Sequence, residues 1–251
     1  MNSIAVSAIV FLSVFAAALV GMAVRRILPD DHVGSDAREV VRLATGLIAT
    51  MGALVLGMLV SSAKSSYDAR KNEVAEMSSE IVTIDRLLTM YGPETVELRG
   101  EFRQLVQASL DRIWPSEASQ KPELRPSDRA EIVVDQLERL APKNDTQAAA
   151  KAQAPAMIIR LRQTQWLMFL KSEQAAVPFP LLVILVSWLA AIFVSFGLFA
   201  PPKSTVVVTL ALGALAVSSA IFIIMEMYAP FRGVLKISPI PILEALSHMQ
   251  R

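Results

Sequence analysis

The chain has 251 residues and a formal net charge of +1, and 53% of its residues are hydrophobic while 19% are charged. A chain this apolar is not an ordinary soluble domain, so its charges must be segregated from long apolar stretches. The near-neutral charge gives no reason to expect a nucleic-acid partner, and the absence of cysteine excludes disulfides, thiol catalysis and cysteine-ligated metals.

Four stretches are long and apolar enough to cross a bilayer. Each holds about twenty residues without a charged side chain, which at 1.5 Å per helical residue matches the ~30 Å hydrocarbon core. The first is interpreted as a retained helix rather than a signal peptide, because no basic residue precedes it and Arg25 and Arg26 follow it. The four helices are expected at residues 4–24, 44–63, 180–200 and 205–225.

These spans predict the domain organisation. Short links join the first span to the second and the third to the fourth, so each pair forms a transmembrane hairpin. The expected regions are a hairpin over residues 1–63, a soluble insert over 64–177, a second hairpin over 178–227 and a C-terminal tail over 228–251.

The second span continues without proline into a stalk that ends at Gly92-Pro93. Apolar residues along the stalk follow one another at spacings of three and four, which is typical of a heptad seam. The seam residues are Val74, Met77, Ile81, Ile84, Leu88 and Tyr91. The predicted fold class is therefore all-α, with four membrane helices, a helical soluble insert and a second helix extended as a stalk.

The second span also carries small residues at every fourth position. Small residues let membrane helices approach closely, but a strict four-residue row drifts about 40° per step around a helix of 3.6 residues per turn. One straight partner cannot follow such a row, so it favours packing against several neighbours, as in a ring or tight bundle. Because the span is rich in Gly, Ala, Ser and Thr, composition alone also explains a row of this kind. The pore or helix-packing candidates are Thr45, Ala49, Ala53, Gly57, Ser61 and Ser65, and a shorter row in the third span comprises Ser187, Ala191 and Ser195.

The insert is expected to be wholly helical. Amphipathic patterns predict helices from Glu94 to about Trp114, from Ser127, and from Gln147 or Pro155 toward the third span. The first of these can fold back against the stalk as an antiparallel hairpin. The tail is expected to turn helical from Ser238 or Pro239.

Motifs that carry catalysis are absent. The insert holds no histidine, no glycine-rich phosphate loop and no hydrolase or metalloprotease signature. We therefore predict no enzyme, no cofactor and no metal site. Glu226, at the end of the fourth span, is a membrane-edge acid and a functional candidate, although we expect its carboxylate to reach interfacial water.

Four ordered segments carry a resemblance to a known family. They are Ser61-Ser-Ala-Lys-Ser-Ser-Tyr-Asp-Ala-Arg70, Asp85-Arg86-Leu-Leu with Tyr91-Gly-Pro93, Phe196-Gly-Leu-Phe-Ala-Pro201, and Pro230-Phe-Arg-Gly-Val-Leu-Lys-Ile-Ser238. Over almost its full length the chain resembles the bacterial bestrophin-like membrane proteins, which are distantly similar to bestrophin anion channels. Bestrophins are pentamers with four membrane helices, cytosolic termini and a pore lined by the second helix.

The resemblance implies a homo-oligomer, such as the pentamer of bestrophins, that lies in the bacterial inner membrane and passes small anions. The second span differs from a bestrophin neck because it has no aromatic residue between Ala44 and Ala63. The acidic cluster of the bestrophin calcium clasp is also missing, so calcium gating is not implied. The alternative is a non-conducting scaffold or sensor that binds a partner through its helical stalk.

The orientation in the membrane has two opposing indications. Basic residues are slightly denser in the short links than in the segments that flank the insert and tail, which favours an external insert. Those in the links are Arg25, Arg26, Arg38, Arg42 and Lys203, and those on the other side are Lys64, Arg70, Lys71, Lys171, Arg232 and Lys236. The resemblance instead implies a cytoplasmic insert with both termini in the cytoplasm, and this is the orientation we adopt as the prediction.

Overall fold

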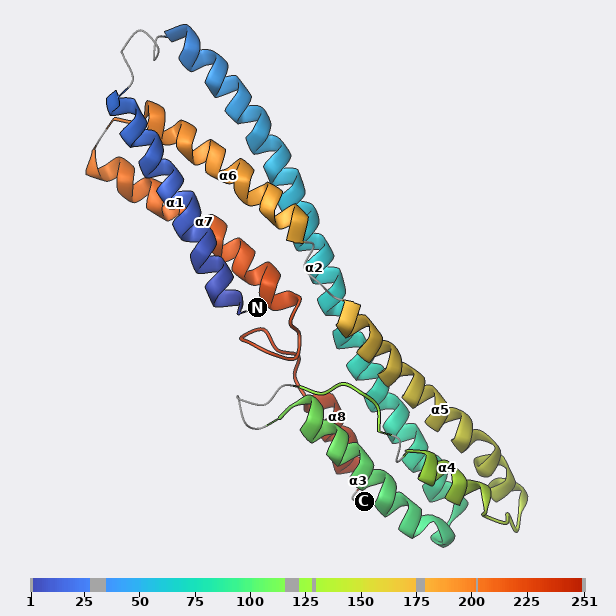
Figure 1. The fold of residues 1–251 in the computed structure, drawn as a ribbon. Helices are drawn as coiled ribbons and strands as arrows, with labels where there is room; N and C mark the ends of the chain where they lie inside the picture. Colours follow the sequence, from blue (N-terminus) through green and yellow to red (C-terminus); the bar gives the residue numbers. More distant parts are fainter. Residues whose placement is uncertain are drawn as a thin grey trace. The chain divides into compact units, whose positions relative to one another are not determined.

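The structure is a computed structural model that describes residues 2–27, 35–115, 122–127, 130–174, 179–201 and 203–249. This part of the chain contains eight α-helices, one 3-10 helix and no strand, which confirms the all-α prediction. Four helices are long and apolar enough to cross a membrane (Figure 1). They are α1 (Ser3–Ile27), α2 (Ser35–Tyr91), α6 (Phe179–Phe199) and α7 (Ser204–Met227), and each contains one of the four expected spans or closely coincides with it.

The chain divides into two compact units. Unit 1 comprises Met1–Ser66 and Ala176–Ala229, and unit 2 comprises Tyr67–Ala175 and Pro230–Arg251. Helix α2 is a single helix of 57 residues that contributes its first part to unit 1 and the remainder to unit 2. The domain boundary expected at residues 177 and 178 lies outside the described residues. From Pro230 onward the expected C-terminal tail falls in unit 2.

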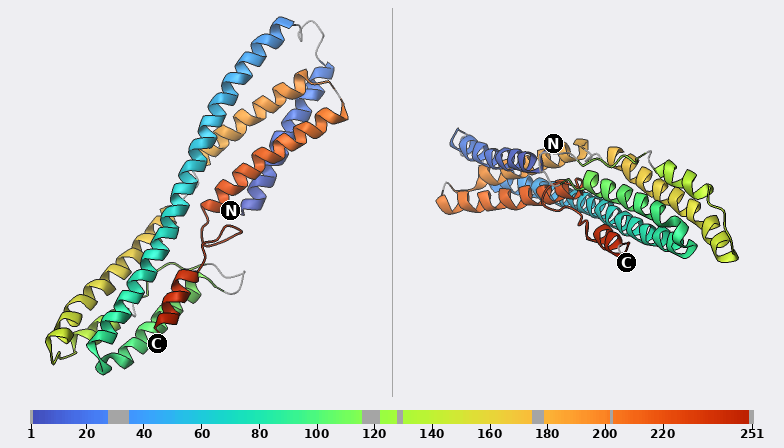
Figure 2. Two further views of the ribbon diagram at one scale, coloured as in Figure 1. Left: turned by 180° about the vertical axis from the view of Figure 1, so that it is seen from behind. Right: turned by 90° about the horizontal axis from the view of Figure 1, so that it is seen from below.

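Unit 1 is a bundle in which α1 packs along α6 and α7 (Figure 2). Four aliphatic residues spaced by four, Val6, Val10, Val14 and Ala18, form the buried stripe of α1. This spacing places all of them on one side of the helix, where they meet buried residues of α6 and α7.

Two glycines set the closest approach between α1 and α6. A Cβ atom on Gly21 would clash with the carbonyl oxygen of Val194, and a Cβ atom on Gly197 would clash with that of Ala18. The two backbones are therefore in contact, as is typical of small-residue crossings in membranes. The shorter small-residue row of the third span does not make this contact, because Ser187 and Ala191 are exposed.

Unit 2 has its own hydrophobic core, built around the second part of α2. The other contributors are α3 (Val96–Ile113), α4 (Ala130–Glu138), α5 (Asp145–Gln174) and α8 (Ile240–His248). The buried face of α3 is the expected amphipathic one, and its members are Leu98, Phe102, Val106, Leu110 and Ile113. Pro155 lies within α5, so that helix begins before the proline, near the earlier of the two expected starts.

A tight turn connects α2 to α3 through a 3-10 helix (Pro93–Thr95). Gly92 adopts a φ of 121°, a left-handed conformation that side chains disfavour, so glycine suits this position. The buried Thr95 hydroxyl donates to the Leu88 carbonyl at 2.6 Å and thus satisfies one of the last carbonyls of α2. Beyond the turn, Arg99 holds Asp85 with two hydrogen bonds, Nε to Oδ1 at 2.8 Å and Nη2 to Oδ2 at 3.1 Å.

The C-terminal segment closes the core of unit 2. The Trp114 indole donates from Nε1 to the Ile237 carbonyl at 2.8 Å, and its ring meets that of Phe231 edge to face. Farther along, Ser78 on α2 donates to the Pro241 carbonyl at 2.6 Å. The segment Pro230 to Ser238, one of the four that carried the resemblance, therefore supplies core contacts through Phe231 and Ile237.

Candidate functional site

The membrane part of α2 is the least covered of the four spans. In the most apolar 18-residue window of each helix, 28% of the residues of α1, α6 and α7 are buried, but only 11% of those of α2. The packed side of α2 consists of Leu59 and Ala63, which meet Leu185 of α6 and Ile224 of α7. Val55 and Leu56 are partly buried beside them, and Ile48 packs against the neighbouring cluster of α1, α6 and α7.

The small-residue row turns from this packed side to the open side. Thr45, at its start, is half-buried and donates from Oγ1 to the Ser195 hydroxyl at 2.9 Å. A Cβ atom added to Gly57 would meet nothing within 4 Å. The residues of the row that are exposed are Ala49, Ala53, Gly57, Ser61 and Ser65. Within one protomer most of the row is therefore exposed.

Large apolar side chains accompany the row on the open side of α2. Leu47, Met51, Leu54 and Met58 are each at least half exposed and follow one another at spacings of four and three. Lipid tails solvate such side chains as well as another helix does, so their exposure is compatible with either neighbour.

The membrane-edge acid is placed differently from our expectation. Glu226 is the penultimate residue of α7 and is only 3% exposed. The prediction that its carboxylate reaches interfacial water is wrong for the protomer, because the fold covers this end of α7. Close by in the chain, the Tyr228 hydroxyl lies 3.3 Å from the Ser62 hydroxyl of α2.

Two arginines bind the C-terminal end of α6, at the other end of unit 1 from Glu226. Arg25 of α1 donates to the Ala200 carbonyl at 2.9 Å, and Arg38 of α2 donates to the Phe199 carbonyl at 3.0 Å. These carbonyls belong to the C-terminal end of α6, where intrahelical partners run out and the helix dipole favours positive charge. Sequence reasoning counted both arginines only as topology signals, and their acceptors could not be identified without the tertiary structure.

All six residues of the stalk seam are buried in unit 2. Their exposures do not exceed 2%, and all but Tyr91 share one core with residues of α3, α5 and α8. The seam is therefore occupied within the protomer. The helices of the same chain thus cover the seam, and it offers no free surface to a partner within the described part of unit 2.

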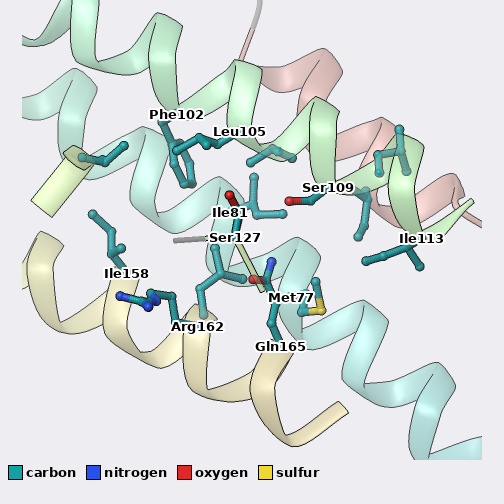
Figure 3. A pocket seen from close by; sticks show the side chains of 15 residues that line it. Met77, Ile81, Phe102, Leu105, Ser109, Ile113, Ser127, Ile158, Arg162 and Gln165 are labelled. Carbon is teal, nitrogen blue, oxygen red and sulfur yellow. The ribbon is translucent and has the colours of Figure 1, made fainter. Parts of the chain in front are cut away.

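A small gap lies in unit 2 between α2, α3 and α5 (Figure 3). Its volume is about 40 Å³, and aliphatic and aromatic side chains such as Met77, Ile81 and Phe102 line most of it. Arg162 at its edge is already paired with Glu131 at 3.1 Å. Because one water needs at least ~10–15 Å³ of such space, the gap accommodates a few waters and is too small for a substrate.

A buried carboxyl lies on α2 beside α5. Glu80 is 4% exposed, and Arg160 Nε approaches its Oε1 to 3.1 Å while the same guanidinium contacts Glu76 at 3.0 Å. Within the described residues neither oxygen of Glu80 makes a well-directed hydrogen bond. Burial, and then the neighbouring Glu76 carboxylate, raise the pKa of Glu80, and Arg160 offsets this only in part.

Among the described residues, no group of three or more His, Asp or Glu side chains is placed to hold a metal ion. The arrangement of the helices and the similarity to known families are therefore the remaining indications of function. The Bestrophin-like domain model matches residues 11–242. The chain belongs to the Bestrophin-like family. Searches of curated proteins and of solved structures gave no match.

Membership of the Bestrophin-like family confirms the resemblance noted from the four segments. The matched range includes α1 from residue 11 onward, the other three membrane helices, the whole insert and the beginning of α8. It identifies a membrane protein of the bestrophin type.

Proposed function

We propose that this Bestrophin-like protein forms a homo-oligomeric channel for small anions, in which the membrane part of α2 lines the central axis, and that it is not an enzyme. The observation that carries the proposal is the unequal coverage of the spans, 11% for α2 against 28% for the others. A helix whose open side carries small residues suits close approach to copies of itself around an axis.

The proposed pore-lining residues are Ala53 and Gly57, because both are exposed and neither supports the packing of the protomer. A phenylalanine at either position projects into the axis if α2 lines it. We expect Ala53→Phe and Gly57→Phe to reduce halide flux into liposomes at least tenfold, or to change the mass of the detergent-solubilised oligomer measured by light scattering.

The matched control is Ala216→Phe, which places the same bulk on an exposed alanine of α7. Ala216→Phe is expected to leave both flux and oligomer mass unchanged. A monomeric or dimeric wild type contradicts the proposal, since no symmetric ring then exists for α2 to line. Unchanged flux and unchanged mass in both α2 variants contradict it as well.

One observation favours a second candidate, a non-conducting scaffold. Helix α5 of unit 2 exposes a stripe of Ile159, Trp166, Leu167 and Leu170, each at least 38% accessible. Such a stripe on an aqueous insert is unusual for a monomer and suits a protein partner. Under this alternative, Trp166→Ala abolishes capture of that partner in cross-linking experiments, and wild-type liposomes show no halide flux.

We further propose that the protein lies in a bacterial inner membrane with the insert and both termini in the cytoplasm. Reporter fusions after Gln120 test this orientation. Fluorescence of a cytoplasm-dependent reporter together with an inactive periplasmic phosphatase supports it, and the reverse pattern contradicts it.

A further inference from the structure

An open cleft of about 800 Å³ lies in unit 1 between α2, α6 and α7, at the end where α6 stops and α7 starts. Neither the proposed pore nor the family match accounts for it. One end of the cleft carries two guanidinium groups, those of Arg38 and Arg42 from the beginning of α2. The rest is lined largely by apolar side chains, among them Phe196 and Leu210.

The charge of the cleft is positive and uncompensated in the described part of the chain, because no acidic side chain lines it. Within the described residues Arg38 uses one donor for the Phe199 carbonyl, and its guanidinium carbon lies 5.5 Å from the centroid of the Phe199 ring. Its other donors have no acceptor in this part of the chain and can bind a ligand. Arg42 is exposed and donates to no group in the described residues.

Hydroxyl groups extend the polar end. Thr205 and Thr209, from the first turns of α7, also line the cleft. The N-terminal turn of α7 adds the positive end of its helix dipole to the two guanidinium charges. Because the Thr209 hydroxyl donates to the Thr205 carbonyl at 2.9 Å, the donor set consists of the two guanidinium groups and the Thr205 hydroxyl, and it suits the oxygens of a phosphate group.

The apolar lining distinguishes between anions. A halide or free phosphate is small and strongly hydrated, and it gains nothing from contact with Ala49, Phe196 and Leu210. A cleft of about 800 Å³ is near the upper end of the ~300–1,000 Å³ typical of sites for organic ligands. An amphiphile with a phosphate head and a hydrocarbon tail satisfies both ends at once.

We propose that this cleft binds an anionic phospholipid, with its phosphate held by Arg38 and Arg42 and the first part of an acyl chain against Ala49, Phe196 and Leu210. The location supports a lipid, because the cleft opens at the end of helices that are apolar enough to span a bilayer. Basic residues at that depth extend toward the headgroups and attract anionic lipids.

The test is native mass spectrometry of the full chain in detergent, titrated with phosphatidylglycerol or with phosphatidylcholine of the same acyl chains. Wild type is expected to bind phosphatidylglycerol at least tenfold more tightly. Arg42→Gln should weaken phosphatidylglycerol binding about tenfold, the equivalent of one charge-assisted contact, and Arg42→Lys should weaken it less. Arg42 is the preferred position because Arg38 also caps α6.

Arg26→Gln is the matched control, since it removes the same charge from the same end of unit 1 but does not line the cleft. It should bind phosphatidylglycerol like wild type. A second variant, Ala49→Phe, fills the apolar part without changing charge and should weaken both lipids. Lipid binding is read without any flux measurement, so this test is independent of channel activity.

Three results overturn the proposal. Equal affinity of wild type for the two lipids removes the role of the headgroup. Equal losses in Arg26→Gln and Arg42→Gln indicate diffuse attraction to a charged surface rather than a site. Displacement of phosphatidylglycerol by millimolar inorganic phosphate assigns the cleft to a free anion instead of a lipid.

Discussion

The two parts of α2 carry similar apolar spacings but differ in exposure. In unit 2, Ile84 and Leu88 are completely buried, whereas in unit 1 Leu47 and Leu54 are 65% and 70% exposed. Water around the insert penalises every exposed apolar side chain, so the chain covers that part of the helix itself. A bilayer imposes no such penalty, so the apolar side chains of a membrane span need no protein partner.

This comparison changes how the two patterns are interpreted. An apolar seam in an aqueous region indicates that its side chains are buried, and here other helices of the same chain bury them. An apolar face in a membrane span indicates only that lipid or protein is next to it. Small residues on that face are therefore more informative than large ones, because close approach of another backbone requires them.

The largest expected effect comes from a matched pair of truncations along α2. Leu88→Ala should destabilise unit 2 by about 2–5 kcal/mol, since it creates a cavity at a side chain with no exposure. Leu54→Ala should change the same quantity by less than about 0.5 kcal/mol. Amide hydrogen exchange of unit 2 in the full chain measures both. Equal loss of protection in the two variants contradicts the comparison.

A second pair tests close backbone contact inside unit 1. Gly197→Ala places a methyl group against the Ala18 carbonyl and should destabilise the α1–α6 pair by about 1–3 kcal/mol. Gly57→Ala meets open space on α2 and should not destabilise the protomer. Thermal unfolding in detergent compares the two variants with wild type. If Gly197→Ala is as stable as Gly57→Ala, α1 and α6 do not touch at this point.

A third substitution examines the polar link between α2 and α3. Arg99→Met leaves Asp85, whose side chain is 12% exposed, without its bidentate partner and should cost about 1–2 kcal/mol after allowance for partial solvation. Arg103→Met, an exposed change on the same helix, is the control and should be neutral. Denaturant unfolding followed by tryptophan fluorescence provides the measurement. A neutral Arg99→Met variant shows that the pair is dispensable.

The smallest effect concerns pH. The pKa of Glu80 is raised above its ordinary value of 4.5 in the folded chain, so the unfolded chain ionises first as pH rises. Glu80 therefore lowers stability as pH rises through 4.5 toward the folded value, and this penalty persists at neutral pH.

Replacing Glu80 by Gln removes this penalty together with the Arg160 pairing, whose effect on the pKa is smaller than that of burial. Glu80→Gln is expected to raise the unfolding temperature at pH 7.5 and to have less effect at pH 5. The control Glu97→Gln alters an exposed carboxylate and should show no such pH dependence. A Glu80→Gln variant less stable than wild type at pH 7.5 shows that the ion pair outweighs burial.

Much of the fold was predictable because it depends on local pattern. Uncharged runs located the four spans, and the Gly92-Pro93 pair marked the end of α2. The environment of Glu226 was not predictable in this way, because its burial depends on helices that are distant in sequence. The capping of α6 by Arg25 and Arg38 was missed for the same reason, since 175 and 161 residues separate each arginine from its acceptor.

The candidate site was predictable only as a set of positions on one helix. Spacing placed Ala53 and Gly57 on the same drifting row, but it did not reveal that α2 would be the most open of the four spans. The small residues that make the closest contact, Gly21 and Gly197, also did not stand out, because their sequence neighbours are ordinary apolar residues. Their role in packing is recognisable only once α1 and α6 are seen to cross at these positions.

By itself, the sequence determined the all-α class, the membrane spans, the stalk and the family resemblance, because hydropathy, helical period and turn residues act over a few neighbouring positions. The tertiary structure decided that the stalk seam is covered by α3, α5 and α8, that the tail completes the same core, and that Arg38 and Arg42 line a cleft beside α6 and α7. These outcomes depend on which distant helices meet, and that choice is set by the burial of the whole chain rather than by local pattern.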